Sequence, residues 1–259
     1  MIQKKTSTLR RLAMQGFELV AGGHNFYALL EFDISELRNY LRSKRQRGEG
    51  GTLFAFIIKA IAECLKEFPV FNAMIDLRKT TIFPEIDINI PIEIERNGEY
   101  FTKQCIIRDA NLKTVKQISD AIDASKSNKE EELGFVQSKA AKRLLSIMPG
   151  GLMLLLFRMV LSNHTRVKET SGTVFVTSVS MFSNVPGYVI PFTGGPKAVS
   201  FAIGSSIRKP VVIKDSITVR EMLNITVAFN HDIIDGAPAA RFINKLRAYI
   251  ENDYMKIIK

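Results

Sequence analysis

The alternation of apolar and polar side chains along this 259-residue chain predicts strands and helices in mixed order. Residues 86–95 read Ile-Asp-Ile-Asn-Ile-Pro-Ile-Glu-Ile-Glu, and this period of two is typical of a strand with one face in a core. Asn97-Gly98 then indicates a two-residue hairpin turn, and Tyr100 to Ile107 is expected to be the return strand. Helical periodicity instead marks Leu53 to Phe68, which a proline stops.

The same patterns predict further elements of both kinds. We expect strands at Phe26–Phe32, Gly172–Ser178, Ala198–Ile207, Val211–Ile213 and Met222–Asn230. We expect helices at Leu9–Val20, from Asp33 to the break at Gly48–Gly51, at Leu112–Leu133 and at Gly236–Asn252. Because no internal repeat and no Ser/Gly-rich or Ala/Pro-rich linker divides them, we expect one mixed α/β (α+β) domain over residues 1–259.

The composition is that of a folded protein and excludes a disordered or low-complexity chain. Hydrophobic residues make up 46% of the chain and charged residues 24%. Cys64 and Cys105 lack the spacing of metal ligands, and two cysteines cannot form a dense disulfide framework. The N-terminus is polar and shows no secretory signal, so a reduced, cytoplasmic setting without a metal site is the expectation.

The chain is basic, with 36 Lys and Arg against 26 Asp and Glu, which gives a formal net charge of +10. Three kinds of partner suit this excess: nucleic acid, an anionic membrane, or an anionic small molecule such as a phosphorylated cofactor. No base-stacking or recognition motif accompanies the charge, so nucleic acid is the last choice of the three.

Of the three histidines, His231 has the most informative surroundings. It ends the apolar strand Leu223–Phe229 and precedes Asp235-Gly236, where a helix begins. Histidine is the side chain whose unperturbed pKa lies near neutrality, so an imidazole held at the end of a strand suits proton abstraction. The same residues also fit a structural role, in which His231 satisfies a turn and Asp235 caps the helix. His24 and His164 fit ordinary surface or structural histidines.

The segment His231–Gly236 matches the His-x-x-x-Asp-Gly motif of the chloramphenicol acetyltransferase superfamily. Its continuation through Ile243 resembles the dihydrolipoamide acyltransferase catalytic domain of 2-oxoacid dehydrogenase complexes. The similarity extends to Gly172–Ser178, Pro69–Ile75 and Asp87–Pro91, and it covers nearly the whole chain except about 140–170. This resemblance implies a chloramphenicol acetyltransferase-like two-layer sandwich, a mixed β-sheet with helices packed on it, that forms a trimer.

The resemblance also implies roles for individual residues. His231 would be the general base that deprotonates a thiol, hydroxyl or amine as it attacks an acyl thioester, and the Ser178 hydroxyl would donate to the oxyanion. Asp235 would be an orienting carboxylate, for which Arg10 or Arg11 is a candidate partner, whereas His24 receives no role. In this superfamily the base and the hydroxyl come from neighbouring chains, so an obligate homotrimer, or a larger assembly built from trimers, is implied.

Three features depart from the lipoate-dependent members of this family. The chain shows no lipoyl domain, peripheral-subunit-binding domain or Ala/Pro linker, so no covalently bound lipoyl group is expected in it. Asp232 follows the histidine where the complex enzymes usually carry Arg. An apolar insertion runs through residues 144–161; Pro149, two glycines and Arg158 interrupt it, so we do not expect it to span a membrane. Either it packs in the core or at a subunit contact, or it touches a long acyl chain or a membrane surface.

These features together predict a stand-alone acyltransferase that uses coenzyme A as the acyl-CoA substrate. The candidates for holding the CoA phosphates are Arg208 and Lys209, with the Arg38–Arg47 cluster. One alternative is a dihydrolipoamide acyltransferase core that borrows a lipoyl protein in trans. The other is an oligomeric scaffold without catalytic activity. The acceptor is not predicted.

Overall fold

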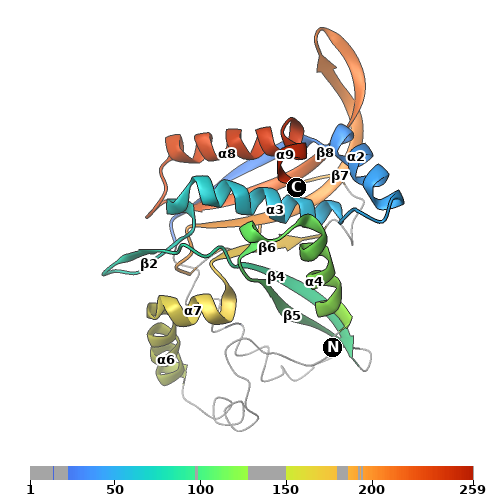
Figure 1. The fold of residues 1–259 in the computed structure, drawn as a ribbon. Coiled ribbons are helices and arrows are strands. Elements are labelled where there is room, and N and C mark those ends of the chain that lie inside the picture. The colour runs from blue at the N-terminus through green and yellow to red at the C-terminus, as the bar shows by residue number, and fades with distance from the viewer. Residues whose placement is uncertain are drawn as a thin grey trace, which may run out of the picture.

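A six-stranded mixed sheet forms the centre of the computed structural model, which describes residues 14, 23–96, 99–127, 150–179, 186–191, 193 and 195–258 (Figure 1). The strand order is β1-β8-β7-β6-β4-β5, and β6 runs parallel to both β4 and β7, whereas the other neighbours are antiparallel. The strands are β1 (Asn25–Asp33), β4 (Ile88–Arg96), β5 (Glu99–Ile107), β6 (Val174–Ser178), β7 (Val199–Ile213) and β8 (Ser216–Asn230), and β2 (Ala73–Ile75) pairs separately with β3 (Thr80–Ile82).

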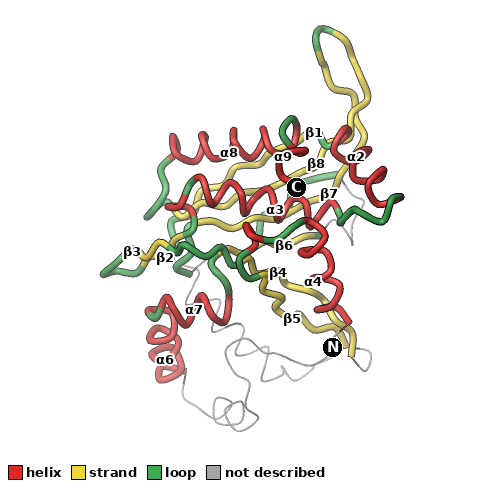
Figure 2. The backbone as a smooth tube through the Cα atoms, in the orientation of Figure 1, coloured by secondary structure: helices red, strands yellow, loops and turns green. Residues whose placement is uncertain are grey.

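Helices cover one face of this sheet, as Figure 2 shows for α3, α4 and α8. The helices are α2 (Ser35–Gln46), α3 (Leu53–Glu67), α4 (Val115–Ser127), α6 (Gly150–Ser162), α7 (His164–Ser171), α8 (Gly236–Glu251) and α9 (Tyr254–Ile257), with 3-10 turns at η1 (Pro69–Phe71) and η2 (Ala110–Leu112). The arrangement confirms the predicted mixed α/β class. Its two layers follow from the sheet burying one apolar face under the helices.

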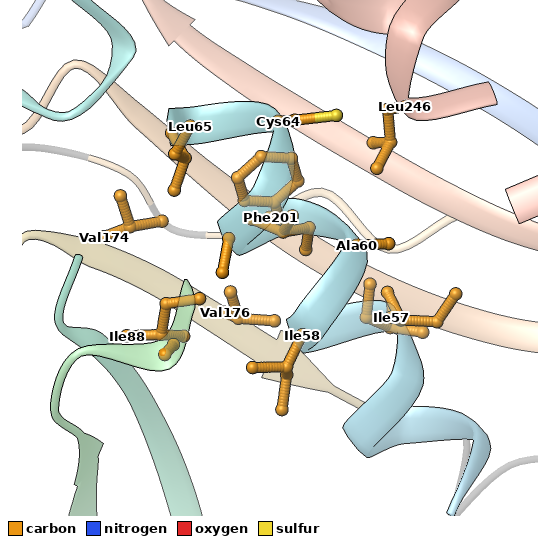
Figure 3. Packing of buried hydrophobic residues seen from close by; sticks show 14 of the residues in the cluster. Ile57, Ile58, Ala60, Cys64, Leu65, Ile88, Val174, Val176, Phe201 and Leu246 are labelled. Carbon is orange, nitrogen blue, oxygen red and sulfur yellow. The ribbon is translucent and has the colours of Figure 1, made fainter. Parts of the chain in front are cut away.

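The core lies between α3 and the sheet. Ile57, Ile58 and Ala60 of α3 pack over Val176 of β6 and Phe201 of β7 (Figure 3). The Thr52 side chain accepts a hydrogen bond from the Ala55 N–H and so caps the helix at its predicted start. A buried aromatic group at the other side of the core joins the loop after α3 to β8 and α8, with Phe71 stacked on Phe242 at 4.5 Å between ring centroids.

Residues 186–191 and 193 lie against the opposite face of the sheet. The Gly187 carbonyl accepts a hydrogen bond of 2.8 Å from the Asn224 side chain, and the hydroxyls of Tyr27 and Thr193 lie 2.9 Å apart. Successive side chains of a strand point to opposite faces. Val174 and Val176 of β6 are buried in the core with α3, so Thr177 between Val176 and Ser178 lies on this second face.

The predicted strands Ala198–Ile207 and Val211–Ile213 are one continuous strand, β7, and β8 begins earlier than predicted. Pro210 does not break β7. On one side it pairs with β8, and on the other side β6 pairs with β7 only as far as Ile203, so within the described residues no strand lies beside Pro210 there. Lys214 and Asp215 both have positive φ angles of 47° and 65°, which suits a two-residue hairpin turn. The result is the β7–β8 arm that projects from the body at the top of Figure 1.

Most other predicted elements are confirmed within a few residues. The pairing of Arg96 with Glu99 joins β4 and β5 as predicted. The predicted helix Leu112–Leu133 begins later, after the 3-10 turn η2, and its last residues lie outside the described part of the chain, as does the predicted helix Leu9–Val20 apart from Met14. His164 begins α7 and is buried beside Asp76 and Thr81, as fits the structural role expected for it.

Lys197, directly before β7, places its ammonium group inside the fold. Its Nζ atom donates hydrogen bonds to the carbonyl and the hydroxyl of Ser171, and burial lowers the pKa of Lys197 to about 7. The unfolded chain keeps a lysine pKa of about 10.4, so between these values the unfolded state binds more protons and stability rises with pH.

We therefore expect Lys197→Met to flatten the dependence of stability on pH. Between about pH 7 and about pH 10, the free energy of unfolding of the unsubstituted protein should gain about 1 kcal/mol per pH unit relative to the variant. Urea unfolding at several pH values measures this difference. Lys116→Met, at an exposed position on α4, is the control and should leave the slope unchanged; the same slope in the Lys197 variant would contradict the prediction.

Candidate active site

His231 lies immediately after β8, where the outer strand β1 begins. The His231 N–H donates to the His24 carbonyl at 2.7 Å, which continues the pairing of Asn25 with Asn230 by one step. The Phe26 ring lies beside the imidazole, with 5.1 Å between ring centroids, and the His231 side chain is 55% exposed. The His24 carbonyl therefore holds the His231 backbone and the Phe26 ring lies beside its imidazole, while the rest of the imidazole remains accessible from outside.

The turn after His231 is organised by Asn230. Its carbonyl accepts hydrogen bonds from the N–H groups of Ile233 and Ile234, and its side-chain oxygen accepts one of 3.0 Å from the Asp232 N–H. Ile234 is buried and anchors the turn in the core. The helix α8 follows at Gly236, so the predicted strand–histidine–turn–helix arrangement is confirmed.

Asp235 occupies the N-cap position of α8, but its side chain makes no capping hydrogen bond, contrary to the purely structural alternative. Its Oδ1 atom lies 3.7 Å from Nδ1 of His231, and the side chain is 82% exposed. This separation is longer than a direct hydrogen bond. If Nε2 of His231 is to accept the proton, a carboxylate on the Nδ1 side is in the right position to orient the imidazole ring.

A second histidine, His24, adjoins this site, and the sequence analysis gave it no role. Its Nδ1 atom lies 2.9 Å from Oδ1 of Asp232, the residue that departs from the family pattern. Two imidazoles and two carboxylates therefore stand together at the junction of β1 and β8. The sequence shows His24 only as the last residue of Gly-Gly-His at the start of a strand. The β1–β8 register is what brings His24 next to His231.

Ser178 is the last residue of β6, and the structure does not place it beside His231 of the same chain. It pairs with Ile203 of β7, which pairs with Ile225 of β8. His231 lies six residues beyond Ile225 and two strands away, which corresponds to about 20 Å at the usual rise per residue and strand spacing. One chain alone therefore cannot bring both side chains to one reacting carbonyl.

Arg208 and Lys209 lie on β7, beyond Ser178 and farther still from His231. Lys209 forms an ion pair with Glu31, whereas Arg208 is exposed. In the Arg38–Arg47 cluster, Arg38 is held by Glu221 at 2.7 Å and by the Ser206 hydroxyl at 2.9 Å, which ties α2 to the β7–β8 arm. Arg42 and Arg45 of α2 are exposed, as is Arg47 directly after the helix. Arg10 and Arg11 lie outside the described residues.

Other types of site find little support in the described part of the chain. Cys64 and Cys105 are free and buried, and burial raises the pKa of both thiols, so neither provides a thiolate at neutral pH. No group of His, Cys, Asp and Glu side chains among the described residues is arranged to hold a metal ion. None of the described helices combines the length and the apolar character needed to cross a bilayer.

Comparison with known proteins gives one consistent result. The family model of the 2-oxoacid dehydrogenases acyltransferase (catalytic domain) matches residues 5–138 and 156–258. The lipoamide acyltransferase component of the branched-chain alpha-keto acid dehydrogenase complex of Bacillus subtilis is 26% identical over 233 residues, which cover 87% of this chain and 46% of that protein. The chain spans about half the length of the curated relatives it matches.

Solved structures show the same fold. A probable dihydrolipoamide acetyltransferase from Listeria monocytogenes has a TM-score of 0.71 at 23% identity and covers 100% of this chain and 96% of its own. A chloramphenicol acetyltransferase has a TM-score of 0.53 at 14% identity, with 97% and 99% covered. The predicted chloramphenicol acetyltransferase-like fold is confirmed, and the chain belongs to the family of the 2-oxoacid dehydrogenase acyltransferase catalytic domains.

Proposed function

We propose that this protein transfers an acyl group between a CoA thioester and an acceptor, at sites formed between the chains of a homotrimer. The observation that carries the proposal is the separation of His231 from the end of β6 in a single chain, at about 20 Å. Two chains related by rotation can bring the histidine of one to the β6 hydroxyl of the next. The exposed imidazole, open on one side, supports such an approach.

In the proposed reaction, Nε2 of His231 accepts the proton of the acceptor thiol, hydroxyl or amine as that group attacks the thioester carbonyl. A hydroxyl at the end of β6 in the neighbouring chain donates a hydrogen bond to the oxyanion. Collapse of the tetrahedral intermediate breaks the carbon–sulfur bond, and the imidazolium returns the proton to the departing CoA thiolate. Asp235 supports the imidazolium from the Nδ1 side.

Two adjacent hydroxyls at the end of β6 are candidates for the oxyanion role. Ser178 ends β6, as proposed from the resemblance, and Thr177 lies on the sheet face that the helices leave uncovered. The helix-free face is the one that a neighbouring chain reaches more readily, so Thr177 is a second candidate that sequence reasoning missed. Removing each hydroxyl separately distinguishes them.

Arg208 and Lys209, the residues predicted to bind the CoA phosphates, are not equally accessible to an anion. Arg208 is exposed and can bind an anion directly, whereas Lys209 must first leave Glu31. The exposed cations Arg42 and Arg45 of α2 and Arg47 directly after it add positive charge at the surface and favour the approach of a polyphosphate.

The assay that tests the function follows release of CoA from acetyl-CoA and longer acyl-CoAs, with free dihydrolipoamide, amines and alcohols as acceptors. We expect CoA release that depends on an acceptor and follows saturation kinetics. A marked preference for dihydrolipoamide would support the second candidate, a core acting on a lipoyl protein in trans, which the name of the Bacillus relative favours. No acceptor-dependent release with any member of the panel would favour an oligomeric scaffold.

A further inference from the structure

The helix α6 exposes a continuous apolar face. Leu152, Leu155, Leu156 and Met159 are 48%, 56%, 38% and 62% exposed, respectively. Their spacing of three and four residues places them on one side of the helix. Isolated exposed apolar residues are common, but four that adjoin on one helix indicate a surface that contacts something apolar.

Within the described residues, the attachment of α6 to the rest of the protein is local. It packs against α7, and Leu161 near its end adjoins the small buried cluster of Met74, Phe83 and Val167. The two helices lie beside the main body, outside the layer formed by α3, α4 and α8 (Figure 1). The apolar face of α6 is thus additional to the core of this chain, which leaves a subunit contact, a long acyl chain or a membrane surface as its predicted partners.

The stretch of sequence that contains α6 is basic. From Leu133 to Lys168 the sequence contains six cations, namely Lys139, Lys142, Arg143, Arg158, Arg166 and Lys168, and no Asp or Glu. This stretch therefore carries +6 of the formal net charge of +10. Arg158 on α6 and Arg166 on α7 are both exposed.

An apolar helix face bordered by cations suits an anionic lipid surface. A second copy of the same face is a poor partner, because it would bring the exposed Arg158 and Arg166 of both copies together, and α6 carries no acidic residue to pair with them. A bound acyl chain is also a poor occupant, since an exposed helix surface leaves the other side of the chain in water.

We propose that α6 docks this protein onto anionic membrane surfaces, lying parallel to the bilayer with Leu152, Leu155, Leu156 and Met159 among the acyl chains. At 13 residues the helix is about 20 Å long, shorter than the hydrocarbon core of a bilayer, so it lies on the membrane and does not cross it. Arg158 and Arg166 contact lipid phosphates. This interaction is independent of the acyl transfer proposed above.

Co-sedimentation of the full-length protein with lipid vesicles tests the proposal. We expect binding to phosphatidylcholine vesicles that contain about 30% phosphatidylglycerol, and much weaker binding to pure phosphatidylcholine. The double variant Leu155→Glu with Met159→Glu should weaken binding at least about tenfold. Arg158→Gln and Arg166→Gln should each weaken it about fivefold, and added salt should weaken binding by the unsubstituted protein.

The control is Ile217→Glu, which changes an equally exposed apolar side chain on the β7–β8 arm and should leave vesicle binding intact. All substituted side chains are exposed, and circular dichroism verifies the fold of each variant. Absence of binding to anionic vesicles, equal binding to neutral ones, or equal loss in the control would overturn the proposal. So would α6 variants that change the oligomeric state or the acyl-chain preference while vesicle binding stays the same.

Discussion

Replacing His231 by alanine is expected to lower kcat for acyl transfer by about 10²- to 10⁴-fold, the range for loss of a general base. The free energy of unfolding should change little, because the side chain is largely exposed and the backbone bond from the His231 N–H to the His24 carbonyl survives the substitution. Initial rates of CoA release, together with urea unfolding curves, measure both quantities on the same preparation.

His24→Gln is the matched control for this experiment. It removes the other imidazole at the β1–β8 junction and keeps a polar side chain opposite Asp232. We expect a loss of less than about tenfold, since His24 is a neighbour of the proposed base and not the base itself. Equal losses in the two variants would show that the two histidines act as a unit. Unchanged rates of CoA release in the His231 variant would show that His231 is not the general base.

Removing the oxyanion-donating hydroxyl at the end of β6 is expected to lower kcat by about 100- to 1,000-fold with little change in KM for acyl-CoA. Ser178→Ala tests the hydroxyl proposed from the sequence, and Thr177→Val tests the one on the helix-free face while preserving shape. A large loss in Ser178→Ala alone assigns the role to Ser178, and a large loss in Thr177→Val alone moves it to Thr177. Normal kcat in both variants would contradict a hydroxyl donor on β6.

Mixing inactive chains then tests whether the site is shared. If each site takes His231 from one chain and the hydroxyl from the next, a trimer that contains both variants can include an intact site. Random mixing of equal amounts of His231→Ala and the inactive hydroxyl variant should recover roughly one quarter of full activity. Activity no greater than the sum of the separate variants would contradict a site between chains.

The fold followed from the sequence wherever local pattern determines structure. The alternation at residues 86–95 corresponds to β4, and Thr52 and the proline after α3 delimit that helix nearly as predicted. The continuity of β7 through Pro210 was missed, because a proline is compatible with a strand only where its edge has no partner, and that depends on where β6 stops.

The candidate site was less predictable than the fold. His231 and Asp235 are close in sequence, so their proximity followed from the motif. The contact of His24 with Asp232 joins residues 208 positions apart, and no local pattern encodes such a register. Likewise, the sequence did not predict the ion pair between Glu31 and Lys209, a candidate phosphate ligand, because it does not tell that β1 lies beside β8.

The pairing of β1 with β8 also has a consequence for biosynthesis. β1 is made early, yet its partner residues 222–230 emerge from the ribosome about 200 residues later. The β7–β8 arm closes through a two-residue turn and needs no distant segment, so we expect it to form within microseconds of its synthesis. The sheet edge at β1 closes afterwards, because long-range pairing must first overcome the entropy of a large loop. His24 and His231 meet only at that step, so the site is among the last parts of a newly made chain to assemble.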